Sequence, residues 1–198
     1  MRVFDFDNTI YDGESGIDFF IYYVKHFPLQ VMKYVPAFTR CVMKYKAGKL
    51  AIEDVFTDYS YILKECCEKF EDPEEEIKIF WDCNQKKIKK WIADMLGEDD
   101  VILSASPEPL LLEICNRLNI KNVIGSVVDI KSGEISELCF RDNKIKRFKD
   151  VYGDTVIDEF YTDSMNDKPF MDISKDVYYV TGDKIEKIKE NGVYLRRM

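Results

Sequence analysis

Two carboxylates stand close together near the start of the chain. Asp5 and Asp7 are separated only by Phe6, and they directly follow the apolar residues Val3 and Phe4. Residues two apart in a strand point to the same face, so the two carboxylates would repel each other unless a cation lies beside them or one side chain turns away. One of them could then act as a nucleophile, and the other as a general acid and base.

Further polar residues follow other apolar segments that predict strands. Ser104 comes directly after residues 101–103, and the run 162–167 follows residues 156–161. Lys144 stands near the start of a predicted helix between these two segments. In open α/β sheets the active site lies at the carboxyl ends of the strands. We therefore expect these groups to meet the two N-terminal carboxylates in one crevice.

The residue types in this crevice indicate phosphate chemistry. Asp5 and Asp163 could share a divalent cation, and a hard ion bound by few carboxylates and several waters is typical of magnesium. Ser104, its neighbouring backbone N–H groups and the following helix N-terminus predict an anion site. Lys144 adds a positive charge to the same anion. Asp5 could then carry a phosphoryl group transiently, while Asp7 protonates the leaving oxygen and activates water.

Alternating strands and helices must position these groups. The predicted strands cover 101–103, 122–126, 156–161 and 177–180, the predicted helices cover 109–118, 144–151, 168–173 and 184–190, and 127–140 is typical of a β-hairpin. This alternation predicts a parallel sheet that is covered on both faces, with the N-terminal strand at its centre.

The segment between the first two predicted strands has a different pattern. It predicts four helices, at 16–26, 28–47, 51–70 and 72–96. We expect Pro36 to kink the second helix and Asp72 to cap the fourth. The predicted fold is therefore α/β, with a Rossmann-like core at 1–16 and 97–198 and an inserted α-helical bundle, or cap domain, at 17–96.

Four motifs in this order resemble the haloacid dehalogenase superfamily of phosphohydrolases. They are Asp5-x-Asp7-x-Thr9, Ser104, Lys144 and Asp163-Ser164-x-Asn166-Asp167. Each motif is weak alone, but all four stand in order at predicted strand ends or helix starts. The resemblance covers the whole chain, and the helical insert looks like the type-1 cap of the subfamily that contains phosphoserine phosphatases.

The resemblance implies a role for each matching residue. Asp5 would be the nucleophile, Asp7 the acid and base, and Lys144 a further catalytic residue. Mg²⁺ would be held by Asp5, Asp163 and the backbone carbonyl of Asp7, and Asp167 would orient metal-bound water or Lys144. The expected contacts to a small phosphorylated substrate come from Thr9, Glu14, Ser104, Ala105, Lys144 and Asn166.

The resemblance leaves the substrate open. Phosphoserine phosphatases carry arginines about where Thr57 and Tyr59 stand here, and one of them grips the substrate carboxylate. Arg40 is a possible replacement. The segment after Ser104 looks more like a branch that acts on lipid head-group phosphates, which is the second substrate class. A phosphotransferase and a non-hydrolytic module that binds a phosphorylated ligand are the alternative functions.

Composition argues against several other classes of protein. The 198 residues carry a net charge of −8, which argues against non-specific nucleic-acid binding. No segment approaches the roughly 20 apolar residues of a membrane span, and no signal peptide is visible, so we expect a cytoplasmic protein without stable membrane insertion. With one histidine and no CxxC pair among six cysteines, a zinc site is not expected. The sequence gives no oligomeric state.

Four further residues are assigned to ordinary structural roles. We expect Ser106 to be mainly a helix cap and Lys146 to be a solvated helix residue that competes weakly with Lys144. The pair Arg196-Arg197 near the C-terminus is expected to be solvated.

Overall fold

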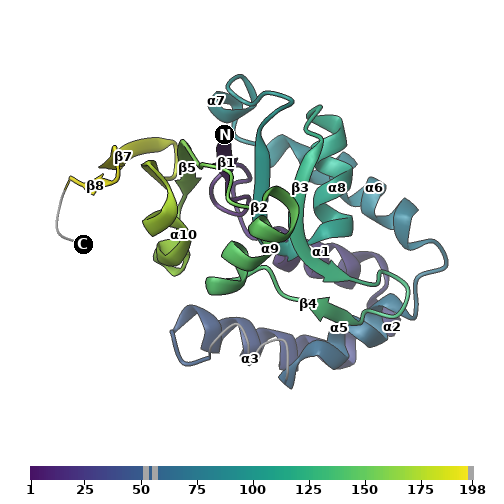
Figure 1. Cartoon of the computed structure of the whole chain (residues 1–198). Helices are drawn as coiled ribbons and strands as arrows, with labels where there is room; N and C mark the ends of the chain where they lie inside the picture. The colour runs from purple at the N-terminus through teal and green to yellow at the C-terminus, as the bar shows by residue number, and fades with distance from the viewer. Residues whose placement is uncertain (51–53, 55–57, 196–198) are drawn as a thin grey trace.

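One mixed sheet forms the centre of the fold. A computed structural model describes residues 1–50, 54 and 58–195, and the strands of these residues follow the order β4-β3-β2-β1-β5-β6-β7-β8 (Figure 1). β1 (Arg2–Phe4) lies between β2 (Val101–Pro107) and β5 (Glu159–Thr162) and runs parallel to both. The predicted central place of the N-terminal strand is therefore confirmed.

The sheet is parallel in the middle and antiparallel at both edges. β3 (Asn122–Val128) pairs in parallel with β2, and β6 (Asp176–Thr181) pairs in parallel with β5. β4 (Ile135–Glu137) runs back along β3, as the predicted hairpin requires. β7 (Lys184–Glu190) and β8 (Val193–Tyr194) form the other edge. The predicted α/β class with a mostly parallel central sheet is confirmed.

The segment 184–190 corrects one prediction. We predicted a helix there, but the segment is strand β7, which is antiparallel to β6. Gly182 has φ +59°, and the two-residue turn that it begins returns the chain directly along β6. The ladder of hydrogen bonds to β6 decides the conformation, because a seven-residue helix would leave this edge of β6 unpaired.

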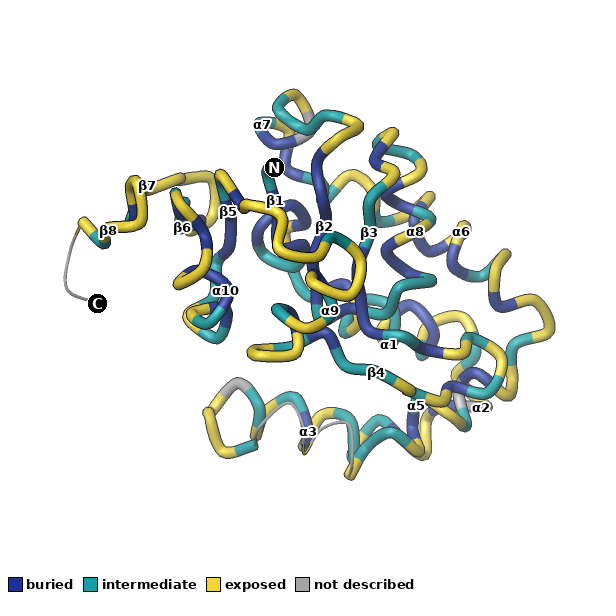
Figure 2. The backbone as a smooth tube through the Cα atoms, in the orientation of Figure 1, coloured by how far each residue is buried: buried dark blue, intermediate teal, exposed yellow. Residues whose placement is uncertain are grey.

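Helices cover both faces of the sheet, because successive strand residues point to opposite sides. Phe4 packs on one face and Val3 on the other. The helices on the side of Phe4 are α6 (Pro73–Asn84) and α8 (Glu108–Arg117), and those on the side of Val3 are α9 (Asp142–Tyr152) and α10 (Lys168–Ile173). The central strands are accordingly buried, whereas β7 and β8 are largely exposed (Figure 2).

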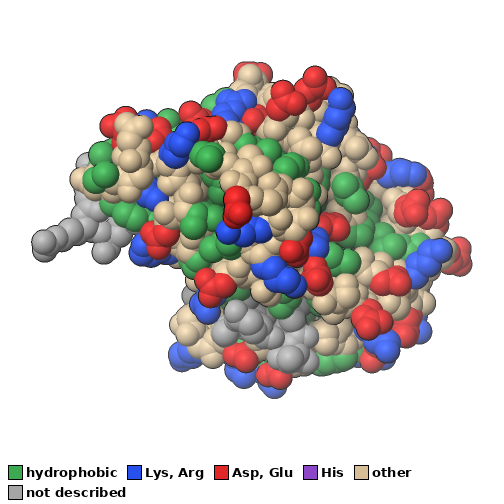
Figure 3. Space-filling model, in the orientation of Figure 1, with side chains coloured by type: hydrophobic (Ala, Val, Ile, Leu, Met, Phe, Trp, Pro, Cys, Tyr) green, Lys and Arg blue, Asp and Glu red, His purple; other side chains and the backbone are tan. Residues whose placement is uncertain are grey.

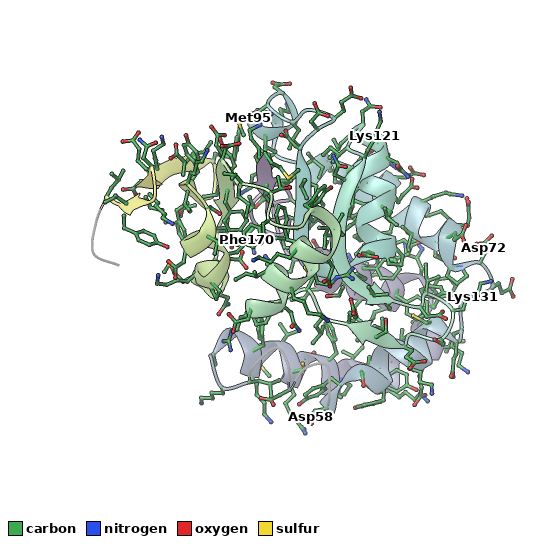
Figure 4. The ribbon with its side chains drawn as sticks, viewed as in Figure 1. Asp58, Asp72, Met95, Lys121, Lys131 and Phe170 are labelled. Carbon is green, nitrogen blue, oxygen red and sulfur yellow. The ribbon has the colours of Figure 1, made fainter. Side chains whose placement is uncertain are left out.

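Phe170 of α10 shows how the second face is filled (Figure 4). Its ring lies 4.8 Å from that of Phe160 on β5 and 5.4 Å from that of Phe148 on α9, measured between centroids. These edge-on contacts fix α9 against the sheet. Because α9 carries Lys144 in its first turn, this packing also sets the position of that lysine.

Helices fill the segment between β1 and β2. In chain order they are α1 (Ser15–His26), α2 (Pro28–Val31), α3 (Val35–Lys46), α5 (Ser60–Cys67), α6 and α7 (Lys90–Ala93). Tyr23, Val31, Tyr34 and Ile62 form a separate buried cluster at the centre of the first four. Figure 1 shows α3 and α5 below the edge of the sheet at which the hairpin of β3 and β4 projects. The division at residues 16 and 97 remains a prediction.

Two predicted helices are interrupted. The second is broken by the 3-10 helix η1 (Met32–Tyr34) before Pro36, not kinked at it, because proline fits the first turn of α3. The fourth begins with Asp72 accepting from the Glu75 N–H, as predicted, but ends at Asn84. Ile88 then bridges to Tyr11 in the first loop. Of the predicted helix 51–70, residues 51–53 and 55–57 lie outside the described part.

The remaining surface and cysteine predictions can be compared with the described residues. No described helix is both long and apolar enough to cross a membrane. Cys41, Cys67, Cys115 and Cys139 are buried, Cys83 is exposed, and all five are free thiols. Acidic and basic side chains are interspersed over the face that Figure 3 shows. Arg196 and Arg197 lie outside the described residues.

Candidate active site

A buried lysine joins two carboxylates at the carboxyl edge of the sheet. Lys144 Nζ lies 2.8 Å from Asp5 Oδ1 and 2.7 Å from Asp167 Oδ1, and all three residues are buried. Burial acts to lower the pKa of Lys144, but Asp167 and Asp5 outweigh it and raise that pKa. These two contacts favour the charged form of the lysine at this position. Lys146 is exposed and lies 3.7 Å from Glu137, so it does not compete for this position.

Asp5 occupies the first position after β1. Its backbone N–H donates to the carbonyl of Tyr161 on β5 at 2.9 Å, which fixes the residue at the sheet edge. Burial raises the pKa of its carboxyl group well above the usual range, and Lys144 opposes that rise. Lys144 therefore orients the Asp5 side chain and favours its ionised form, which is the form that can act as a nucleophile.

Asp7 turns away from Asp5 and is held by two serines. Its Oδ1 accepts from the backbone N–H of Ser15 at 2.7 Å, and its Oδ2 accepts from Ser106 Oγ at 2.5 Å. Burial raises the pKa of Asp7, and the bonds from Ser106 and Ser15 oppose the rise. The two carboxylates therefore avoid mutual repulsion because each has its own partners.

Ser106 corrects a prediction. It was expected to be mainly a helix cap, but the N-cap residue of α8 is Pro107, which makes no side-chain cap bond. The Ser106 hydroxyl instead binds Asp7 and lies 2.9 Å from Ser15 Oγ. β2 continues to Pro107 and so carries Ser106 past the expected helix start.

The predicted phosphate contacts lie at different depths. Ser104 is buried, and its Oγ accepts from the Ser106 N–H at 3.2 Å. Ala105 is half-buried beside it, and its carbonyl accepts from Ser126 Oγ at 2.6 Å. Thr9 is fully buried, and its hydroxyl has no hydrogen-bond partner among the described residues. Ser104 and Thr9 are therefore buried to the same extent, and Ala105 is the more accessible of the three residues.

The last motif brings more carboxylates to the same edge. Asp163 follows β5 directly, and burial, with Glu14 and Asp167, raises its pKa to about 6. Asp167 Oδ2 accepts from Thr162 Oγ1 at 2.7 Å, which orients it toward Lys144. Asn166 is half-buried in the short turn that Ser164 caps. Glu14 Oε1 accepts from Asn8 Nδ2 at 2.9 Å in the loop after β1.

These carboxylates suit a hard divalent cation. The charge on Asp163 raises the pKa of Asp5, so the two groups lie close enough to repel each other. A bound cation would remove that repulsion, and carboxylate and carbonyl oxygens are the ligands that Mg²⁺ takes. No group of three or more His, Cys, Asp or Glu side chains placed to hold a metal occurs among the described residues. A site formed by two carboxylates and the Asp7 carbonyl needs no such group.

Sequence reasoning missed three residues of this site. Ser15 and Ser106 hold Asp7, and Tyr45 of α3 faces the same groups from the helical segment. Burial raises the pKa of Tyr45, and the charges on Glu14 and Asp163 raise it further. A serine two residues after Ser104 was visible in the sequence as a possible partner, but Tyr45 carried no signal.

The positions discussed for binding a substrate carboxylate lie in the helical segment, and the structure describes only some of them. Thr57 lies outside the described residues, whereas Tyr59 is half-buried. Arg40, the suggested replacement for the missing arginines, is exposed on α3. Arg141, which precedes α9, is exposed too, and its charge acts on Tyr45.

Comparisons with known proteins identify the family. The model of the haloacid dehalogenase-like hydrolase family matches residues 3–172. The chain belongs to this family. The match includes all four motifs, from Asp5 to Asp167. No curated protein matches the sequence.

Several solved structures are similar to this chain in fold. A protein of unknown function from Bordetella pertussis Tohama I is 16% identical, with a TM-score of 0.70 over 86% of this chain and 85% of that one. A phosphoserine phosphohydrolase-like protein from Francisella tularensis is 16% identical, with a TM-score of 0.60 over 89% and 86%. A phospho-aspartyl intermediate analogue of phosphoserine phosphatase is 14% identical, with a TM-score of 0.53 over 89% and 83%. At these identities the likeness concerns the fold alone.

Proposed function

We propose that this haloacid dehalogenase-like hydrolase is a Mg²⁺-dependent phosphomonoesterase. The observation that carries the proposal is the different environment of its paired carboxylates. Burial raises the pKa of both carboxyl groups, but Asp5 faces the buried ammonium of Lys144, which favours its ionised form, whereas Asp7 is held by Ser106 and Ser15. Two carboxyl groups with such different partners suit a nucleophile beside a general acid.

The proposed reaction has two steps. Asp5 attacks the phosphorus of the ester and forms an aspartyl phosphate, while Asp7 gives its proton to the departing alkoxide oxygen. Asp7, now ionised, takes a proton from water, which attacks the phosphorus and releases inorganic phosphate from Asp5. Lys144 holds Asp5 in place throughout and offsets charge on the phosphoryl oxygens.

The metal part of the proposal concerns three residues. Asp5, Asp163 and the Asp7 carbonyl would hold Mg²⁺, which when bound neutralises carboxylate charge that would otherwise repel the phosphate. Asp167 would keep Lys144 oriented, since the two form a buried ion pair. Ser104, Ala105 and Asn166 would bind the phosphate.

The test is hydrolysis of p-nitrophenyl phosphate with Mg²⁺ and with a chelator. Asp5→Asn should lower turnover by about three orders of magnitude or more, because it removes the nucleophile. Asp12→Asn is the matched control, since Asp12 is an exposed carboxylate of the same loop, and it should keep wild-type turnover. Equal rates for Asp5→Asn and wild type would refute the mechanism.

The same assay distinguishes the alternative functions. Transfer of phosphate to an added alcohol in preference to water would indicate a phosphotransferase. Mg²⁺-dependent binding of a phosphorylated compound, without turnover of any ester, would indicate a non-hydrolytic module. A panel that contains phosphoserine and lipid head-group phosphates would then separate the two substrate classes that the sequence left open.

A further inference from the structure

A cavity leads from the catalytic edge of the sheet into the helical segment. Its volume is about 280 Å³. Asp7, Ala105 and Ser106 are among its lining residues. The rest of the wall comes mainly from α1, α3 and α5, and Figure 1 shows α3 and α5 below the sheet. A group bound at Asp7 therefore has a direct continuation into this cavity.

The wall of this cavity is apolar along most of its length. Phe20 of α1, Phe38 and Val42 of α3, and Leu63 of α5 are representative. Asp7 and Glu14 are the charged groups among the described lining residues. Both are acidic, so the described wall offers no cation to a substrate carboxylate.

The aromatic part of the wall is packed and preformed. The rings of Phe20 and Phe38 stack with centroids 3.7 Å apart, which joins α1 to α3. Phe70 lies 4.5 Å from Tyr23 and 6.0 Å from Phe19, again between centroids. Because the rings support one another, the cavity needs no collapse or opening to accept an apolar group of its own size.

We propose that the alcohol part of the substrate is uncharged and apolar and fills this cavity. The inference rests on the proposed function, which places the phosphate at Asp5. Burying a carboxylate against this wall would cost free energy that no described cation returns, whereas each buried methylene contributes favourably. The wall thus selects aryl or alkyl phosphates over phosphoserine.

The first experiment measures binding and needs no turnover. Methyl-, propyl- and pentylphosphonate are titrated by calorimetry in the presence of Mg²⁺. The dissociation constant should fall about fourfold for each added methylene until the cavity is full. A dissociation constant that does not fall from methyl- to pentylphosphonate overturns the inference.

A charged isostere tests the choice of a neutral group. Aromatic walls also attract quaternary ammonium ions, so 3,3-dimethylbutylphosphonate is compared with its trimethylammonium analogue of the same shape. Tighter binding of the neutral compound supports the inference. Tighter binding of the cation, or of 2-amino-4-phosphonobutanoate as the phosphoserine isostere, overturns it.

A wall substitution and its neighbour test the location. Val42→Asp puts a charge into the cavity and should abolish the increase in phosphonate affinity with chain length, which is called the gain below. Met43 is the matched control because it lies on the same helix with 61% of its surface exposed, and Met43→Asp should keep the wild-type gain. If Val42→Asp fails to fold, Val42→Thr keeps the shape and should reduce the gain. An unchanged gain in the folded variant at position 42 would overturn the location.

Ester hydrolysis separates failure of this inference from failure of the proposed function. Equal kcat/KM for methyl and pentyl phosphate would refute the apolar preference while leaving the phosphatase intact. Absence of turnover for every ester, with the expected gradient of phosphonate affinity, would refute the phosphatase and leave the cavity assignment standing.

Discussion

Different interactions stabilise the buried side chains at the catalytic edge and those in the cavity beside it. At the edge, Lys144 has two carboxylate partners, and Asp7 has two serine partners, all within 2.9 Å. In the cavity, rings such as those of Phe20 and Phe38 contact one another through their faces. The first region depends on directional bonds between charged atoms, and the second depends on apolar area and shape.

This difference explains why the two regions occupy different elements. A buried charge is tolerated only with partners at defined positions, and the strands of the sheet fix such positions. Apolar contacts tolerate changes of side chain if volume is kept, so helices can supply them. Under the proposed function, the core would supply the chemistry, and the helical segment would select the group attached to the phosphate.

The largest expected effect follows from removing the buried lysine. Lys144→Met should lower the free energy of unfolding by about 3–5 kcal/mol, because it leaves Asp5 and Asp167 buried without their cation. It should also abolish turnover. Urea unfolding measures the first effect, and Lys146→Met is the control, with a change within about 0.5 kcal/mol. A small loss of unfolding free energy in Lys144→Met would mean that the stability of Asp5 and Asp167 does not depend on this lysine.

The apolar region should lose stability without losing chemistry. Ile62 is 3% exposed and lines the cavity, so Ile62→Ala should cost about 2–4 kcal/mol in unfolding free energy. Turnover of methyl phosphate should stay near wild type, because the side chain does not touch the catalytic carboxylates. If methyl phosphate turnover fell in proportion to stability, the two regions would not be independent.

The contact between the β3–β4 turn and α5 offers a third test. Gly133, at the turn between β3 and β4, has φ +69°, and an added Cβ would lie 2.5 Å from Lys64 Cα on α5. Gly153 has φ +60° but open space around it. Both alanine variants place a side chain at positive φ, but only Gly133→Ala also adds a clash with α5, so Gly133→Ala should cost about 1–3 kcal/mol more than Gly153→Ala. Thermal unfolding of the two variants measures this difference.

Equal losses for the two glycine variants would mean that the hairpin turn does not hold α5. The cavity wall at Leu63 would then be set by the helices alone.

The smallest expected effect concerns the catalytic edge, and it is a change in kcat/KM. Ser106→Ala removes one of the two bonds to Asp7 and should lower kcat/KM about tenfold, or ~1.4 kcal/mol, with little change in unfolding free energy. Ser106→Thr keeps the hydroxyl and should restore the rate. Ser136→Ala is the control, since Ser136 lies on the exposed strand β4. A loss that threonine does not restore would assign Ser106 to packing.

Much of the site could be predicted from local pattern. Asp5, Ser104 and Asp163 each stand at the end of an apolar run, and parallel strands bring their carboxyl ends to one edge. The sequence by itself therefore determined the α/β class, the central first strand, the four motifs and the place of Lys144 near the start of a helix. These features depend on residue periodicity and on neighbours within a few positions.

Only the tertiary structure decided how these parts are held. Ser106 binds Asp7 across 99 positions of the chain, and Tyr45 reaches the site from a helix whose pattern indicated only a buried face. The segment 184–190 is a strand because β6 offers it hydrogen bonds, although its residues also permit a helix. The cavity exists because α1, α3 and α5 meet with their apolar sides together. Periodicity shows which side of an element is apolar, but the contact between distant segments selects its partner, since apolar attraction has no direction.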